Sequence, residues 1–122
     1  MIRGDEAAQL ARVILELRRR RTDHLPQDLF GEAAWGLLLA MFIADTEGIR
    51  LSAWTLFDRS GTSRVQGRRW MAVIMELGLA VSDGPCDGQN VVSLTARGIS
   101  AVEACMADAQ ELMGTKPPIA ET

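Results

Sequence analysis

The sequence has few of the residues that build metal centres and disulfide frameworks. Its 122 residues include two cysteines, Cys86 and Cys105, and one histidine, His24. These three residues are too few and too far apart for a zinc-binding pattern, and two cysteines do not make a disulfide framework. We therefore expect reduced thiols, no metal and no cofactor. No cysteine or carboxylate stands at ligand spacing from His24, so we expect this side chain on the surface or in an ordinary hydrogen bond.

Signals for membranes, export and catalysis are also lacking. The longest apolar run, residues 37–44, is far shorter than the roughly 20 residues that span a bilayer. We find no basic, apolar and small-residue leader, and we expect no signal peptide and a cytoplasmic location. The sequence has no evident nucleophile–base pair and no Gly-rich phosphate loop. We therefore expect neither an enzyme nor a membrane partner.

An overall excess of positive charge is absent too, since the net charge is −3 at pH 7. The arginines are nevertheless clustered. Residues 58–70 contain four arginines and one aspartate, whereas residues 71–122 contain two basic and seven acidic residues. The distribution of charge indicates nucleic-acid binding better than its total does. A second run, the four arginines at residues 18–21, can either stabilise a helix C-terminus or contact phosphates.

The main arginine cluster lies on a predicted helix, residues 62–77. At about 100° per residue, one face of this helix is apolar and consists of Gly67, Trp70, Val73, Ile74 and Leu77. The opposite face consists of Arg64, Val65, Arg68, Arg69 and Ala72. Thr62 or Ser63 can cap the start, and Gly78 suits the left-handed position that ends a helix. We therefore expect a helix that packs on a core and presents guanidinium groups outward.

The order of the other elements gives this helix a context. A shorter helix at residues 52–60, with Trp54 facing inward, and a tight break at Ser60-Gly61 precede it. This is the plan of a helix-turn-helix, whose second helix enters the DNA major groove. The other expected elements are an amphipathic helix at 5–22, a buried helix at 32–45, an extended segment at 49–51, strands at 79–82 and 91–94 joined by a turn-rich segment at 83–90, a helix at 95–113 and a mobile tail at 114–122. The two strands form a hairpin in the position of a wing. The expected fold is mainly α with a small β-hairpin wing, in a single domain over residues 1–113.

Several short motifs occur in a fixed order along the chain. They are Asp28-Leu29-Phe30, Trp35, Leu38-Leu39, Arg69-Trp70, Glu76-Leu77-Gly78-Leu79, Val92-Ser93-Leu94-Thr95 and Gly98. With this order of elements, the chain resembles winged-helix transcriptional regulators of the MarR type. The resemblance implies a homodimer formed by the first and last helices, about residues 5–22 and 95–113. It also implies that helix 62–77 lies in the major groove, that the wing touches DNA, and that a small aromatic ligand binds in some members.

The expected wing departs from the family pattern. Family wings usually carry an aspartate followed by basic residues. Here residues 87–90 read Asp-Gly-Gln-Asn, and no arginine or lysine stands between Arg69 and Arg97. The expected wing therefore lacks the basic residues with which family wings contact the minor groove.

These observations predict a homodimeric, sequence-specific regulator that binds double-stranded DNA. The apolar stripes of the two terminal helices support a second copy, because exposed stripes of this kind mark interfaces. The expected DNA-binding residues are Arg59, Thr62, Ser63, Arg64, Val65, Arg68 and Arg69. Arg64 and Arg68 are expected to contact bases and Val65 a thymine methyl, whereas Arg59 and Arg69 are expected on phosphates.

Two alternatives stay open from the sequence. Any one of these arginines can be a solvated charge or can form a local ion pair, such as Arg69 with Asp58 or Glu76. The acidic wing also fits a winged-helix module that binds other proteins and has lost DNA binding.

Overall fold

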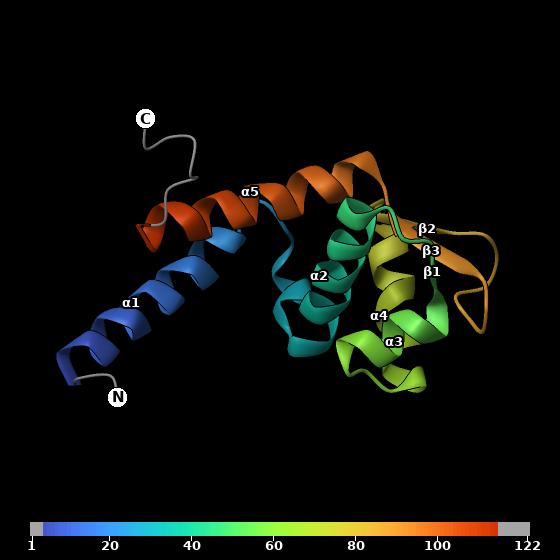
Figure 1. Ribbon diagram of the computed structural model, residues 1–122, viewed down its shortest axis with the longest axis horizontal. Coiled ribbons are helices and arrows are strands. Elements are labelled where there is room, and N and C mark those ends of the chain that lie inside the picture. Colours follow the sequence, from blue (N-terminus) through green and yellow to red (C-terminus); the bar gives the residue numbers. More distant parts are fainter. Residues whose placement is uncertain (1–3, 115–122) are drawn as a thin grey trace.

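The structure is a computed structural model and describes residues 4–114. These residues form a mainly helical fold with a small antiparallel sheet (Figure 1). In chain order, the elements are α1 (Gly4–Arg21), a 3-10 helix η1 (Gln27–Phe30), α2 (Glu32–Glu47), β1 (Leu51–Ser52), α3 (Ala53–Ser60), α4 (Arg64–Glu76), β2 (Ala80–Ser82), β3 (Val91–Leu94) and α5 (Ala96–Leu112). The predicted helices and the hairpin are confirmed. The expected mobile tail lies outside the described residues from residue 115 onward.

Helix α2 lies at the centre of the fold, as its nearly continuous apolar sequence predicts. It packs against α3, α4, α5 and β3. Its buried side chains are Ala34, Leu37, Leu38, Met41 and Ala44. The helix ends at Gly48, which adopts a left-handed conformation with φ of 70° and so costs little strain.

The sheet has three strands in the order β1-β3-β2, all antiparallel. Leu51 pairs with Val92, and Ala80 pairs with Leu94. Val92 and Leu94 are buried because alternate residues of a strand face the same side. The segment before α3 was expected only to be extended, and its pairing with the hairpin is a finding of the structure. This pairing ties the start of α3 to the strands that carry the 83–90 turn.

Local chemistry fixes α3 and α4 at their ends. The Ser52 side chain accepts a hydrogen bond from Thr55 N at the start of α3, and Gly61, with φ of 71°, ends that helix. At the start of α4, the Ser63 side chain accepts from Gln66 N at 3.2 Å. Of the two predicted caps it is therefore Ser63, and not Thr62, that begins α4.

The buried face of α4 differs from the predicted face. Gly67, Met71 and Ile74 are buried, whereas the expected Trp70 is only half-buried, as are Val73 and Leu77. Gly67 sits so close to Phe57 of α3 that an added methyl group would lie 2.5 Å from the Phe57 ring. Compared with the predicted orientation, α4 is rotated about its axis so that Gly67 faces Phe57 and Met71 faces the core. The arginines of α4 therefore point in other directions than predicted.

Helix α1 stands apart from this core. In Figure 1 it reaches away from α2, α3 and α4, and it packs against α5. None of its described residues is buried, and Leu10, Ile14 and Leu15 are 40%, 50% and 63% exposed. The predicted amphipathic helix therefore exists, but its apolar stripe is largely uncovered within one chain.

Charged side chains fasten the C-terminal end of α1 to its own turn and to α5. Arg19 and Arg20 both bind Glu16, and Arg20 also pairs with Asp108 and Glu111 of α5. The hydrogen bonds that Glu16 accepts, with the larger effect from Arg19 and the smaller from Arg20, lower the pKa of Glu16 to about 2. His24 lies 2.8 Å from Asp108, which confirms a histidine satisfied by an ordinary hydrogen bond.

Within residues 4–114, no helix combines the length and the hydrophobicity needed to cross a membrane.

Candidate nucleic-acid interface

The predicted site residues follow one another from the end of α3 into the second turn of α4. Arg59 is exposed in the last turn of α3, Thr62 is half-buried in the connecting turn, and Ser63 caps α4. Arg64, Val65, Arg68 and Arg69 are all exposed on α4. Val65 is 71% exposed, the largest exposure among the large apolar side chains of the described chain.

The rotation of α4 decides which of these residues face directly outward. Counting about 100° per residue from the buried face, Val65 and Arg69 lie nearly opposite the core. Arg64 and Arg68 instead lie on the flank of the helix, beside α3 and the 83–90 turn. Arg64 and Arg68 are exposed, as expected, but they lie to one side of the outward face.

Arg64 lies on an aromatic ring of α3. Its guanidinium carbon is 3.5 Å from the centroid of the Trp54 ring. A guanidinium over a tryptophan face is attracted by the ring's negative π surface. Trp54 was expected to be a simple core contact of α3. It is half-buried, with its ring face under Arg64.

Asp87, in the turn between β2 and β3, connects Trp54 with the second arginine. Its Oδ1 accepts a hydrogen bond from Trp54 Nε1 at 2.9 Å, and its Oδ2 lies 3.6 Å from Arg68 Nη1. The Arg68 and Asp87 side chains are 52% and 45% exposed. We call Trp54, Arg64, Arg68 and Asp87 the Asp87 cluster.

The Asp87 cluster bears on one alternative that the sequence left open, namely that an arginine of α4 forms a local ion pair. An arginine of α4 does form a local ion pair, but the pair is Arg68 with Asp87, and neither Asp58 nor Glu76 is a salt-bridge partner of Arg69. Arg69 instead lies 5.8 Å from the Trp70 ring centroid. Sequence reasoning missed Trp54 and Asp87 as site residues. The signal in the sequence was Asp87 itself, an aspartate in the expected wing with no basic residue after it.

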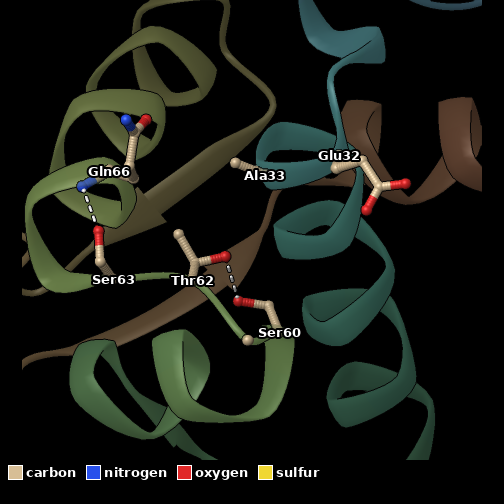
Figure 2. Close-up of a pocket in the computed structure, with 7 residues that line it drawn as sticks. Glu32, Ala33, Ser60, Thr62, Ser63 and Gln66 are labelled. Carbon is tan, nitrogen blue, oxygen red and sulfur yellow. Dashed lines mark hydrogen bonds between the residues drawn. The ribbon is translucent and has the colours of Figure 1, made fainter.

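A small polar pocket lies where the N-termini of α2 and α4 approach each other (Figure 2). Its volume is about 240 Å³. It is lined by Glu32, Ala33, Ser60, Gly61, Thr62, Ser63 and Gln66. Ser60 Oγ donates to Thr62 Oγ1 at 2.9 Å, and Figure 2 shows the Glu32 carboxylate turned away from these hydroxyls. The predicted residues Thr62 and Ser63 thus share one polar surface beside the arginine-bearing turns of α4.

A second crevice lies between α1, α2 and α5, away from this surface. Its volume is about 170 Å³, and it is lined by Leu17, Arg21, Trp35, Cys105, Met106, Asp108 and Ala109. The guanidinium carbon of Arg21 lies 4.1 Å from the Trp35 ring centroid. Burial raises the pKa of the Cys105 thiol to about 11. The crevice is therefore lined by an aromatic ring and two sulfur-bearing side chains, together with the Arg21 guanidinium and the Asp108 carboxylate.

The chain was also compared with known proteins. No protein-family model matches the chain, and no curated protein matches it either.

Proposed function

We propose that this protein is a winged helix-turn-helix regulator that binds double-stranded DNA sequence-specifically as a homodimer. The observation that carries the proposal is the exposed, arginine-bearing N-terminal half of α4, which a capped tight turn holds against α3. The three-stranded sheet, whose 83–90 turn lies beside α4, supports the assignment of a wing. The family resemblance of the sequence motifs agrees with this reading.

The chemistry of the exposed residues suits a DNA groove. Arg64 and Arg68 are proposed to contact bases, since arginine binds guanine with two parallel hydrogen bonds. Val65 is proposed to contact a thymine methyl, which would cover an apolar side chain that is 71% exposed in the free chain. Arg59 and Arg69 are proposed to contact phosphates, which position a protein on DNA without reading its sequence.

The proposed homodimer rests on α1 and α5. Helices in proteins draw most of their stability from packing of an amphipathic face, and α1 buries none of its residues within the chain. A groove of about 440 Å³ lies between α1 and the end of α5, lined by Glu6, Gln9, Leu10, Val13, Leu112, Met113 and Gly114. A second copy of these two helices would cover the groove and the exposed stripe. It would also place two α4 helices in successive major grooves, about 34–36 Å apart.

A small aromatic ligand is part of what the resemblance implies. We place it in the crevice beside Trp35, whose volume of about 170 Å³ is close to that of an apolar cavity that holds benzene, about 150 Å³.

The proposed DNA binding is tested by selecting bound sequences from a pool of random duplexes. We expect recovery of a palindrome, because a symmetric dimer reads two equivalent half-sites. The double variant Arg64→Ala, Arg68→Ala should lose specific binding while its circular dichroism stays unchanged. The matched control is Arg50→Ala, Arg97→Ala, which removes the same charge from exposed positions outside α4. Equal affinity of both double variants for the selected duplex would refute the site.

A second function is favoured by the wing itself. Residues 83–90 carry two aspartates and no basic residue, and Asp87 pairs with Arg68. These features suit a protein-binding module. The salt dependence of binding to random duplex DNA separates the two, because neutralised phosphates make affinity fall steeply with salt. Absence of binding at low salt would favour the protein-binding module.

A further inference from the structure

We propose that Asp87 is a positioning residue for base recognition, which sets the geometry of Arg68 directly and that of Arg64 through Trp54. This inference rests on the proposed DNA binding and assigns the wing a role that its sequence does not suggest. The wing acts on the arginines of α4 instead of carrying its own basic residues to DNA.

The position of Asp87 is fixed by the backbone of the 83–90 turn. Trp54 N donates to Gly88 O at 3.1 Å, and Ala53 N donates to Asn90 O at 2.9 Å. Asn90 Nδ2 closes the turn by donating to Pro85 O at 2.6 Å. The turn is therefore attached to the first residues of α3 just after Asp87, and the hydrogen bond from Asn90 to Pro85 closes it around Asp87.

The two oxygens of Asp87 act on different partners. Oδ1 accepts from Trp54 Nε1 at 2.9 Å and so fixes the orientation of the indole ring. The face of that ring then lies under the Arg64 guanidinium at 3.5 Å. Oδ2 lies 3.6 Å from Arg68 Nη1. One carboxylate thus restricts Arg68 directly and Arg64 through Trp54.

The contacts restrict the arginines without occupying them. A guanidinium has five N–H donors, and a contact through Nη1 leaves donors of Arg68 free for a base. Arg68 and Asp87 are both about half exposed, and ion pairs that exposed are weak, so a base can compete for the arginine. Long side chains lose conformational entropy when they bind, and side chains already held in place lose less.

Asp87 also has an electrostatic effect of the opposite sign. Its negative charge lies next to the surface proposed for DNA, where it repels phosphates whatever the sequence. The positioning role therefore has a signature that plain repulsion lacks. Removal of the charge should strengthen binding to random DNA and weaken discrimination between sequences.

The test compares the wild type with Asp87→Asn, which keeps an oxygen for Trp54 Nε1 and loses the ion pair. The measured quantity is the specificity ratio, defined as the affinity for the duplex selected by the wild type divided by that for a random duplex of equal length at the same salt. We expect the ratio to fall about tenfold, the order of one well-placed arginine–guanine contact. Asp83→Asn is the control, because it removes an equal charge from an exposed aspartate of the same turn and should leave the ratio unchanged.

A second variant, Trp54→Phe, keeps an aromatic face for Arg64 but removes the donor to Asp87. It should also lower the ratio, with circular dichroism confirming that both variants fold. Tighter binding of Asp87→Asn to both duplexes by the same factor would overturn the positioning role, and so would an unchanged ratio in both variants. A wild type that selects no motif would instead overturn the proposed DNA binding, and this inference with it.

Discussion

Gly98 stands where the first turn of α5 meets the segment that leads into β2, and replacing it with alanine should destabilise the fold. A methyl group at this position would lie 2.1 Å from the carbonyl oxygen of Leu79 and 3.2 Å from Leu94 Cδ2. Carbon and oxygen atoms normally approach to about 3.3 Å, so α5 or the Leu79 peptide must move by about 1 Å. The same Leu79 oxygen accepts a hydrogen bond from Thr95 N at 2.9 Å, which this movement would strain.

The expected magnitude follows from two opposing effects. Overpacking against a backbone atom costs about 3 kcal/mol, and replacement of glycine by alanine within a helix returns about 1 kcal/mol. The free energy of unfolding should therefore fall by about 2 kcal/mol. For a chain of this size that corresponds to a melting temperature lower by about 8 °C.

Thermal unfolding followed by circular dichroism measures the effect of Gly98→Ala. The matched control is Gly36→Ala in α2, where the added methyl would lie 3.6 Å from Ser60 O, an ordinary contact distance. Gly36→Ala should leave stability unchanged or raise it by up to about 1 kcal/mol, from helix propensity alone. A Gly98→Ala melting temperature equal to or above that of the wild type would refute the close approach of α5 to Leu79.

Three further predictions test other parts of the structure. Ile14→Glu should convert a dimer into a monomer in sedimentation analysis, while Ile43→Glu, at an equally exposed position on α2, should leave the dimer intact; a dimer in both variants would exclude α1 from the interface. The pKa of Glu16 is lowered to about 2, so its contribution to stability is present above pH 4.5 and is lost as the pH falls toward 2. The melting temperatures of wild type and Glu16→Gln should therefore converge over that pH range, and a constant difference would contradict the contacts with Arg19 and Arg20. Burial raises the pKa of Cys86 and Cys105 to about 11, so both thiols should react slowly with an alkylating reagent at pH 7, and fast labelling would show that they are accessible.

The sequence predicted the features that depend on neighbouring residues. Ser52 and Gly61 bound α3, and Gly78 takes a left-handed conformation after α4, because caps and glycine conformations are set within one turn of the chain. The apolar sequence of α2 likewise predicted its central position, since a helix that is apolar nearly all round requires cover on every side.

The sequence could not show which side chains from distant segments pair with one another. Trp54 and Asp87 are 33 positions apart, and His24 and Asp108 are 84 positions apart. Periodicity contains no information on such pairs. The burial of Met71 was missed for a related reason: the helical wheel gives relative angles, whereas the absolute rotation of α4 is set by the contact of Gly67 with Phe57.

The contacts that the arginines at residues 18–21 make within the chain allow the salt dependence of the proposed DNA binding to be predicted. Arg19 and Arg20 bind Glu16, and Arg21 lies over Trp35, so three of the four already interact within the chain. Their structural role is favoured over a role on phosphates. Under the proposed function, the phosphate contacts would then come from Arg59 and Arg69, which makes two in each subunit and four in the proposed dimer.

Because each neutralised phosphate contributes about −0.9 to the slope, the logarithm of the binding constant should fall against the logarithm of salt concentration with a slope of about −4. Titration of the selected duplex at several salt concentrations measures this slope. Arg69→Ala should reduce its magnitude by about 2 in the dimer, while Arg50→Ala should leave it unchanged. A wild-type slope near −8 would mean that additional arginines reach the backbone, and Arg19, Arg20 and Arg21 could be among them only by leaving Glu16 and Trp35 when DNA binds.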